Sequence, residues 1–429
     1  MKIPEVILIE VEHAPGNLAK VLAAVGEAGL TVEGLEAVRR TQDRTTWELT
    51  FNVDEDDTIN VGARIDALPI ASVLGRSDRV FQMHEGGKIE MVSTVAFDTP
   101  AGLRDLYTPG VARVCLAIRD DRTLARRYTN IQNTVAIVTN GTAILGLGDI
   151  GPVAGMPVME GKAALFHAFA GISGVPILIE SKDPRVIIET TAAIAPSFGA
   201  IQLEDIASPE CFEIERELIE RLPIPVLHDD QHGTAVVTLG AILSASRITG
   251  VDLSTSVVGQ IGLGAAGIGI TRLLSKYGVK RVLGADLDED SLARLEANGG
   301  ERSTLPDLMR TCDIVVATTG VKGLIKPEMI REGQMILALS NPEPEIEPHD
   351  ALTHGAAFAA DGKNINNVLG FPGLFRGVLD AGATGFTDAM LFAAAESLAN
   401  QAPPGQLIPS PLDRQVHDRV AQAVERAAS

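Results

Sequence analysis

The sequence predicts an α/β protein with three parts: a small βαββαβ sandwich of ferredoxin-like topology, then an α/β domain, then a doubly wound parallel sheet. Two observations support this prediction. The chain has 429 residues, which is enough for several domains of about 100 to 200 residues each. Apolar segments with strand and helix periodicities alternate along most of it, as in parallel sheets covered by helices. We place the domains at residues 1–84, 85–235 and 236–429, the last of which ends in a helix over 412–427.

The first 84 residues carry the pattern of the sandwich. Strands are expected over residues 6–11, from residue 31, over 44–53 and near 80–83, helices over 18–28 and 59–68, and an acidic turn over 54–57. This order is that of a split βαβ fold. The first turn reads EHAPGNLA over residues 12–19, and with it the segment resembles an ACT domain. The resemblance implies pairing of copies and a small effector, such as an amino acid, near this turn. A dimerisation module without a ligand is the alternative.

Composition and charge exclude several classes of protein. The chain has 36 Lys and Arg against 56 Asp and Glu, a net charge of −20, which repels nucleic acids and anionic membranes. The first residues lack the charged and then apolar segments of a secretory signal, and no uncharged apolar stretch long enough to span a membrane follows. We therefore expect a cytoplasmic protein that binds neither nucleic acid nor membrane. Cys115, Cys211 and Cys312 are too far apart for a zinc site or a disulfide framework and are expected to be buried thiols.

Acidic side chains follow two strands of the second domain, in which strands are expected over residues 135–138, 143–147, 176–179, 201–203 and 225–227, and helices over 161–169, 185–194 and 233–247. Glu204 and Asp205 follow one strand, and Asp229 and Asp230 follow another. Ligands of open α/β sheets gather at the carboxyl ends of strands. Carboxylates that meet there need a cation, and Mg²⁺ or Mn²⁺ suits oxygen ligands. If the two strands are not neighbours, the acids are surface caps.

Two further residues of this domain are of types that move protons. Lys162 opens an otherwise apolar predicted helix, and beside a dication and a helix N-terminus its pKa should fall toward that of a general base. Tyr107 lies in a predicted turn, where it can donate a proton. Each residue taken alone also fits an ordinary role, Lys162 on the surface and Tyr107 in packing.

A glycine-rich turn marks a nucleotide site in the third domain. The sequence GLGAAG over residues 262–267 follows an apolar strand over 254–261 and opens a helix over 268–276, the context of a Rossmann dinucleotide fold. The predicted contacts are Gly262, Gly264, Ala265, Ala266 and Gly267. Asp286 ends the next strand, over 281–285, at the usual distance for binding the ribose 2′-hydroxyl, which favours NAD over NADP. Asp288 is the alternative for that role, and a helix cap is the alternative role for Asp286.

Taken together, these motifs resemble those of bacterial malic enzymes over residues 88–391. The matching blocks, in the order of the family, are LYTPGVA (106–112), NGTAILGLG (140–148), VMEGKA (158–163), LEDI (203–206), HDDQHGTA (228–235), LSNP (339–342) and NNVLGFPG (366–373). The resemblance implies metal-dependent oxidative decarboxylation of L-malate to pyruvate and CO₂ with NAD⁺, or NADP⁺, as the oxidant. The ACT-like segment is an addition that minimal members of the family lack.

The resemblance also implies roles for single residues. Glu204, Asp205 and Asp230 match the metal ligands, Lys162 the general base, Tyr107 the general acid, and Asp229 a group that assists beside the metal. Asn341 and Asn367 match the amides that contact malate, with Asn366 as a weaker match. No arginine is assigned to the substrate carboxylate. The candidates for this role are Arg113, Arg119 and Arg376. A homo-oligomer, a dimer or larger, is expected.

Two other functions remain open at this point. Malolactic enzymes have similar sequences, hold NAD tightly and convert malate to lactate. A binding protein that senses an effector on a Rossmann scaffold, without turnover, would lack some of the catalytic groups.

Overall fold

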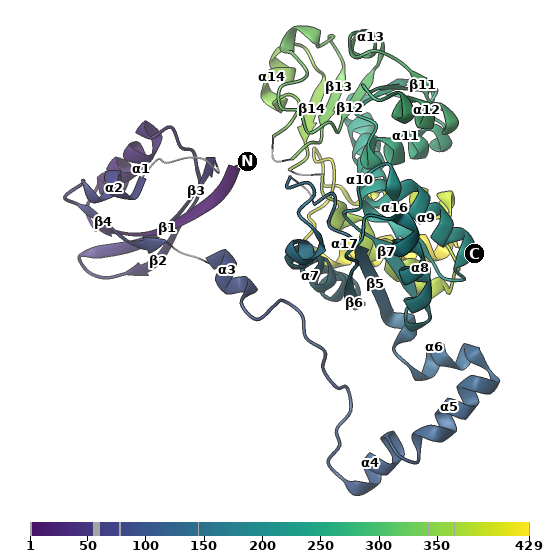
Figure 1. Cartoon of the computed structure of the whole chain (residues 1–429). Helices are drawn as coiled ribbons and strands as arrows, with labels where there is room; N and C mark the ends of the chain where they lie inside the picture. The colour runs from purple at the N-terminus through teal and green to yellow at the C-terminus, as the bar shows by residue number, and fades with distance from the viewer. Residues whose placement is uncertain are drawn as a thin grey trace. The chain divides into compact units, whose positions relative to one another are not determined.

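The computed structural model describes residues 2–54, 61–76, 79–144, 146–341, 343–363 and 365–428. Most of the expected acidic turn at 54–57, and Leu145 and Pro342 of the quoted motifs, lie outside these residues. The chain forms two compact units, Met1–Lys88 and Ile89–Ser429, which are described separately (Figure 1).

The first unit is a four-stranded antiparallel sheet with two helices on one face. Its elements are β1 (Lys2–Glu12), α1 (Asn17–Glu27), β2 (Val32–Arg40), β3 (Arg44–Asp54), α2 (Val61–Asp66), β4 (Ala71–Arg76) and α3 (Arg79–His84), with the strand order β2-β3-β1-β4. Apolar residues of β1, β3, α1 and α2 form its core, because alternate strand residues face the helices. The predicted βαββαβ order is therefore confirmed.

The position predicted for the last strand of this unit is wrong. Residues 80–83 belong to α3, where Phe81 is exposed, and the fourth strand is β4. In β4, Ala71 and Val73 alternate toward the core, and Val73 lies opposite Ile9 of β1. Only this segment can therefore bury its apolar residues as a strand, whereas the side chains of 80–83 have no core to enter.

The second unit begins with a segment that we call the arm, residues 89–128. It contains α4 (Pro100–Leu106), α5 (Val111–Asp120) and α6 (Ala125–Tyr128) and leads to the start of β5 (Figure 1). None of these three helices contains a buried residue. Large apolar side chains are exposed along the arm, namely Met91, Val92, Val95, Phe97, Leu103, Leu106, Val111, Val114 and Leu116. Cys115 is exposed here too, which corrects the prediction of three buried thiols.

A four-stranded parallel sheet follows, with the order β6-β5-β7-β8. Its elements are β5 (Thr134–Thr139), α7 (Pro152–Ala170), β6 (Ser173–Leu178), α8 (Pro184–Ile194), β7 (Ala200–Leu203), α9 (Glu210–Arg221), β8 (Val226–His228) and α10 (Asp229–Thr249). The described residues at positions 143, 144, 146 and 147 do not form the predicted strand; a single bridge joins Ile144 to Gly148. Gly146 and Gly148 adopt left-handed φ values of 75° and 71°, which turn the chain back on itself.

The third part is a six-stranded parallel sheet of order β11-β10-β9-β12-β13-β14, so the doubly wound prediction is confirmed. Its strands are β9 (Val257–Ile261), β10 (Arg281–Ala285), β11 (Glu301–Arg302), β12 (Ile314–Ala317), β13 (Met335–Ala338) and β14 (Phe358–Asp361). The helices between them are α11 (Ala265–Tyr277), α12 (Glu289–Ala297), α13 (Leu305–Thr311) and α14 (Pro348–Thr353). The strand order reverses between β9 and β12, the place where such sheets bind nucleotides.

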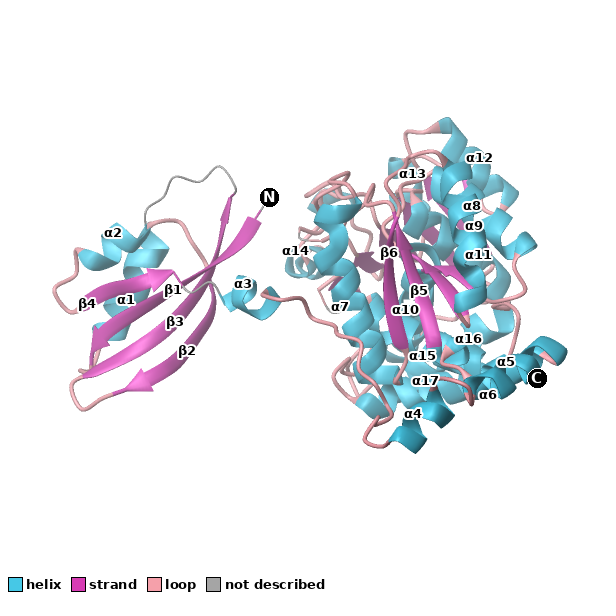
Figure 2. Ribbon diagram, turned by 60° about the horizontal axis from the view of Figure 1, so that its bottom comes forward, coloured by secondary structure: helices cyan, strands magenta, loops and turns pink. Residues whose placement is uncertain are grey.

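Three C-terminal helices join the two parallel sheets into one core. They are α15 (Phe371–Ala381), α16 (Asp388–Gln401) and α17 (Arg414–Ala427), and α16 packs on α10 while α15 and α17 pack on α7 (Figure 2). Buried residues of both sheets and of these helices belong to one hydrophobic cluster. Helix α10 runs without a break through residues 235 and 236, and a domain boundary there remains a prediction.

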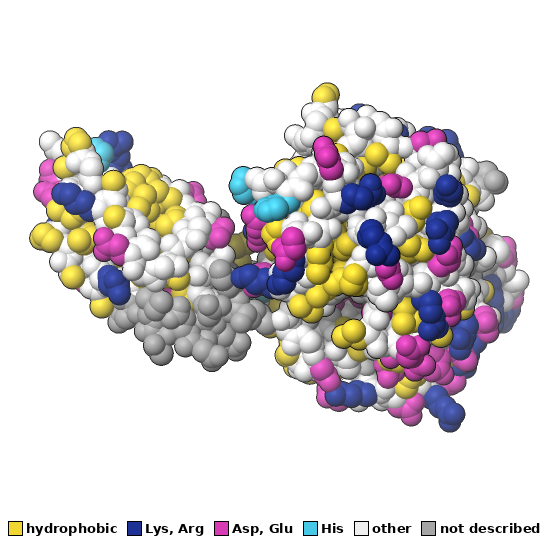
Figure 3. All heavy atoms as spheres, turned by 90° about the horizontal axis from the view of Figure 1, so that it is seen from above, with side chains coloured by type: hydrophobic (Ala, Val, Ile, Leu, Met, Phe, Trp, Pro, Cys, Tyr) yellow, Lys and Arg dark blue, Asp and Glu magenta, His cyan; other side chains and the backbone are white. Residues whose placement is uncertain are grey.

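The surface of the larger unit is of mixed charge on the face that Figure 3 presents, where acidic and basic side chains are interspersed. Such a face differs from the single-sign basic surfaces that track a nucleic-acid backbone. Among the described residues, no helix is both long and apolar enough to cross a membrane.

Candidate active site

Three carboxylates meet at the carboxyl ends of β7 and β8. The two strands pair in parallel with Leu203 opposite His228, which confirms that they are neighbours. Glu204 and Asp205 follow β7 directly, and Asp230 lies in the first turn of α10. Each of these three acids offers one oxygen atom, and the three atoms lie within 4.8 Å of one another.

Backbone geometry aims Asp205 into this cluster. Its φ is 51°, the one left-handed value among the described residues other than glycine, in a region that aspartate tolerates better than most residues. Its backbone N–H donates to Asp230 Oδ2 at 2.9 Å, and its carbonyl oxygen accepts from Ala143. Strain of this kind is typical of functional sites.

Two buried oxygens of the site, Asp205 Oδ2 and Asp229 Oδ1, accept no hydrogen bond from the residues that the structure describes. A buried carboxylate oxygen without a partner costs free energy. All ligand atoms in the cluster are carboxylate oxygens, the donors that Mg²⁺ and Mn²⁺ prefer. Glu204, Asp205 and Asp230 therefore fit a divalent cation.

The electrostatics of the cluster agree with a cation site. Burial, followed by repulsion from the neighbouring carboxylates, raises the pKa of Glu204 well above its usual range, although Lys162 opposes this. Burial and the charge of Asp230 raise the pKa of Asp205 to about 7. Burial would also raise the pKa of Asp230, but contact with His228 keeps it below its usual value. A cation would stabilise all three ionised carboxylates.

Lys162 connects the cluster to Asp229. Its Nζ lies 2.8 Å from Glu204 Oε1 and 2.6 Å from Asp229 Oδ2, and the side chain is only 7% exposed. Helix α7 begins at Pro152, so the expected position of Lys162 at a helix start is wrong. Asp229 and Glu204 outweigh the effect of burial and raise the pKa of Lys162, and the fall expected beside a dication stays a prediction.

Of the predicted substrate amides, Asn341 lies in the loop after β13, and Asn367 opens a short 3-10 helix, Asn367–Leu369. Asn367 Nδ2 donates to Asp229 Oδ2 at 2.7 Å, which brings Asn367 to the cluster. Asn341 follows β13 and donates to the carbonyl oxygen of Gly362 at 3.2 Å. Asn366 is exposed, and its side chain accepts from the backbone N–H of Val368.

Tyr107 is the predicted site residue that the structure leaves apart from the cluster. It ends α4 in the arm, and its side chain is 68% exposed. The arm reaches the sheet at the amino end of β5, whereas the carboxylates lie at the carboxyl ends of β7 and β8. Arg376, one of the candidates for a substrate arginine, pairs with Asp380 and contacts Asn133.

The glycine turn has the geometry of a nucleotide site. Gly262 has a φ of 85°, and a Cβ there would lie 2.8 Å from the carbonyl oxygen of Thr318. A Cβ at Gly267 would lie 2.0 Å from the carbonyl oxygen of Gly262, whereas Gly264 faces open space. Ala265 and Ala266 open α11, whose first N–H groups suit a pyrophosphate.

Asp286 supports this turn from the end of β10. Its Oδ2 accepts from the N–H of Leu263 at 2.6 Å, and its Oδ1 accepts from the N–H groups of Leu287 and Asp288. Asp288 instead caps α12 by accepting from the N–H of Ser291. Asp288 is therefore the cap of α12, and contact of Asp286 with a ribose stays a prediction.

Three buried polar side chains near the predicted residues were not singled out from the sequence. Gln202 donates to Glu204 and is on the same face of β7, a period-two relation visible in the sequence. Glu215 is a buried acid on α9. It lies four residues after the apolar Cys211, a spacing that indicates the same, buried face of the helix. Glu345 is fully buried and accepts from Thr319 and Ser340, and nothing in the sequence around it announced this role.

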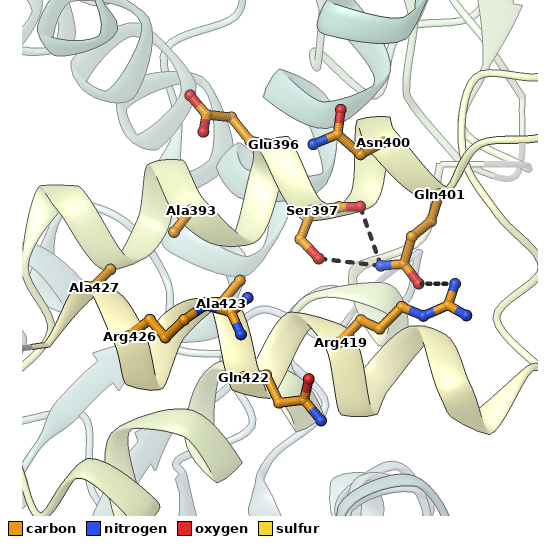
Figure 4. A pocket seen from close by; sticks show the side chains of 10 residues that line it. All are labelled: Ala393, Glu396, Ser397, Asn400, Gln401, Arg419, Gln422, Ala423, Arg426 and Ala427. Atoms are coloured by element: carbon orange, nitrogen blue, oxygen red, sulfur yellow. Dashed lines mark hydrogen bonds between the residues drawn. The ribbon is translucent and has the colours of Figure 1, made fainter.

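A separate pocket of about 650 Å³ lies between α16 and α17 (Figure 4) and is lined by none of the predicted site residues. Three of its polar side chains bond to one another. The amide of Gln401 donates to Ser397, and Arg419 donates to Gln401 Oε1. We assign the active site to the carboxylate cluster.

Comparison with known proteins agrees with this geometry. Residues 87–186 match the model of the malic enzyme N-terminal domain, and residues 231–299 match that of the malic enzyme NAD binding domain. The NAD-dependent malic enzyme 1 of Bacillus subtilis is 54% identical over 98% of this chain and 97% of its own. A bifunctional malic/malolactic enzyme of the same organism is 40% identical over 80% of this chain and 90% of its own. The crystal structure of a malic enzyme from Pyrococcus horikoshii covers 82% of this chain and 90% of its own, at 39% identity and a TM-score of 0.78. The chain is therefore a member of the malic enzyme family.

Proposed function

We propose that this chain catalyses the oxidative decarboxylation of L-malate to pyruvate and CO₂, with reduction of NAD⁺ and with Mg²⁺ or Mn²⁺ as the metal. The observation that carries the proposal is the contact of Lys162 with both Glu204 and Asp229 beside the three-carboxylate cluster. This contact supports a role for Lys162 as the proton acceptor beside a metal site at the edge of the sheet. The names of the relatives, NAD-dependent malic enzyme among them, support the same reaction.

Glu204, Asp205 and Asp230 would hold the metal ion. When bound, the ion supplies Lewis acidity toward the C2 oxygen and the C1 carboxylate of malate. The raised pKa of Lys162 comes from Glu204 and Asp229, so ligation of Glu204 removes part of that attraction. As the neutral amine, Lys162 would then accept the proton of the C2 hydroxyl, and bound NAD⁺ would supply the acceptor for the hydride of C2.

Asp229 and Asn367 orient the proton acceptor. Asp229 Oδ2 accepts from both Lys162 and Asn367, at 2.6 and 2.7 Å. These two contacts on one oxygen hold Nζ of Lys162 in place for proton transfer. The remaining hydrogen-bonding capacity of Asn367 is directed to malate, and Asn341 contributes a second amide.

The cofactor in this proposal is NAD. The carboxylate of Asp286, held by three backbone N–H groups at the end of β10, suits the ribose 2′-hydroxyl and repels a 2′-phosphate. Gly262, Gly264, Ala265, Ala266 and Gly267 provide the pyrophosphate turn.

Tyr107 protonates C3 of the enol after CO₂ leaves, and it acts on the site of a second copy. The reaction requires a proton donor, yet Tyr107 is exposed on an arm whose helices contain no buried residue. Its apolar neighbours Leu103, Leu106 and Val111 are also exposed, and docking on a second copy would bury them. The active unit is thus a homo-oligomer in which copies exchange arms.

The N-terminal unit binds a small effector in this proposal. Its first turn joins β1 to α1 and carries His13, which contacts Arg40 and Thr45 of the neighbouring strands. Asn17, buried at the start of α1, donates to the carbonyl oxygen of Glu12. A module that only pairs copies remains the alternative.

The test is formation of NADH from L-malate by the full-length chain with Mn²⁺, followed by absorbance, with pyruvate measured separately. Pyruvate and NADH in equal amounts are expected, and both should vanish with EDTA. Absence of metal-dependent turnover would refute the proposal. Lactate without net NADH would instead show the malolactic reaction, which the name of one relative makes the second function to test.

A further inference from the structure

We propose that Glu215 is a positioning residue for the metal site, a buried acid on α9 that holds the first turn of α10 and so orients Asp229 and Asp230. The inference rests on the proposed function and deepens it. Glu215 contacts neither substrate nor metal, and acts through the backbone and side chains of residues 228–232.

The residues that contact Glu215 flank Asp229 and Asp230 in the sequence. Glu215 Oε1 accepts from the backbone N–H of His228 at 2.7 Å, and Oε2 accepts from Gln231 Nε2 at 3.1 Å. His232 Nε2 lies 3.0 Å from the same carboxylate. Asp229 and Asp230 lie between these partners, so the turn that carries them is held on both sides.

The backbone contact explains why an acid is needed from outside the helix. His228 is the N-cap of α10, and its side chain makes no capping hydrogen bond. It also ends β8, the edge strand of its sheet, where a buried N–H without a partner would be costly. Glu215 satisfies this N–H and places a negative charge at the N-terminus of a 21-residue helix, where the helix dipole stabilises it.

A chain of contacts continues from Glu215 to a metal ligand. Gln231 Nε2 lies 2.9 Å from His228 Nδ1, and His228 Nε2 lies 3.1 Å from Asp230 Oδ2. His228, Gln231 and Glu215 are all buried. The imidazole therefore has little freedom to rotate, which keeps its Nε2 within ion-pair distance of Asp230 Oδ2.

The chemistry of these contacts distinguishes a carboxylate from an amide. All three partners of Glu215 contribute nitrogen atoms, of which the backbone N–H and the Gln231 amide are donors. A carboxylate accepts at both oxygens, whereas a glutamine in its place would turn an NH₂ group toward one donor. A cavity of about 100 Å³ borders Glu215 and His232, and a glutamine is of equal size to the glutamate that it replaces.

The experiment measures Mn²⁺ binding to the full-length chain without malate, by the electron paramagnetic resonance signal of free Mn²⁺. Glu215→Gln is compared with Glu220→Gln, which changes an exposed acid of the same helix. We expect the dissociation constant for Mn²⁺ to rise about 10- to 100-fold in E215Q, the usual effect of removing a partner of a metal ligand, and to stay unchanged in E220Q. The melting temperature of metal-free E215Q should stay close to that of the wild type.

A wild-type dissociation constant in E215Q would overturn the proposal. A lower affinity for Mn²⁺ would also overturn it if metal-free E215Q loses stability by the same free energy as its binding of Mn²⁺ does, since this indicates a purely structural role. The test does not depend on turnover: a wild-type chain that binds Mn²⁺ without oxidising malate refutes the proposed function and leaves the role of Glu215 measurable. Among active variants, saturating Mn²⁺ should restore most of kcat to E215Q.

Discussion

Lys162 Nζ and Asp229 Oδ2 lie 2.6 Å apart, with both side chains buried, although 67 residues separate them in the sequence. The pair joins the middle of α7 to the start of α10. Glu204 adds a second carboxylate to the same ammonium at 2.8 Å. The ion pair therefore connects the proposed proton acceptor to the metal site.

Lys162→Met should remove turnover and weaken the metal-free fold. Loss of a general base typically costs about 100-fold or more in kcat, and removal of one partner of a buried ion pair costs about 3 kcal/mol. Since Glu204 and Asp229 lose their only cation in the metal-free state among the described residues, Mn²⁺ should recover part of that stability. Urea unfolding with and without Mn²⁺ measures this. Equal stability of variant and wild type without metal would contradict the structure.

Tyr107 should complement Lys162 between chains. Hybrids of a Tyr107→Phe chain with a Lys162→Met chain contain one site with both native groups if the arms exchange. With random pairing, a refolded equimolar mixture should show about one quarter of wild-type activity, although each variant alone is nearly inactive. If Tyr107 acts within its own chain, every site in the mixture lacks one group, and activity stays at the level of the separate variants.

Asp286→Ser should shift the cofactor preference. The substitution removes the charge that opposes a 2′-phosphate and the acceptor for the N–H of Leu263. We expect kcat/KM for NAD⁺ to fall about tenfold. The kcat/KM for NADP⁺ divided by that for NAD⁺ should rise by more than tenfold, and each factor of ten corresponds to about 1.4 kcal/mol. Asp288→Ser, which changes the cap of α12, is the matched control. An unchanged ratio in D286S would remove Asp286 from the ribose site.

Asp388 should contribute stability that depends on pH. Burial would raise the pKa of this acid, but ion pairs with Lys276 and Arg272 of α11 lower it. A depressed pKa in the folded state adds stability above the unfolded pKa, near 4, and the gain is lost as pH falls through the folded value. Asp388→Asn should thus cost about 1 kcal/mol near pH 7, since the pairs are partly exposed, and progressively less below pH 4. Urea unfolding of D388N against the exposed Asp418→Asn tests this, and a difference that grows in acid would contradict it.

The N-terminal unit should confer any effector response. Removal of residues 1–84, which fall within the first compact unit, should abolish the effect of amino acids and related metabolites on the malate reaction while leaving turnover measurable. Such coupling typically amounts to about 1 to 3 kcal/mol. His13→Ala in the full chain should reduce the same response. A response that survives the deletion would assign the effector site to the second unit.

Much of the site was predictable because its residues follow strands. Glu204, Asp205, Asp229 and Asp230 come directly after segments that read as buried strands, and parallel strands bring their carboxyl ends to one edge. The glycine turn was predictable for the same reason, since its spacing after a strand reflects local geometry. Lys162 was found only as part of a motif, and its predicted place at the start of a helix was wrong.

The remaining features depend on packing over long sequence distances. The sequence determined the three-part α/β organisation, the acids at the strand ends and the dinucleotide turn, since periodicity and turn chemistry are local properties. Only the tertiary structure decided that Lys162 contacts Asp229 and Glu204, that Glu215 caps a helix from outside, and that Tyr107 lies on an exposed arm. These relations depend on which buried faces meet, and that is decided by the burial of whole helices and sheets, which no short stretch of residues encodes by itself.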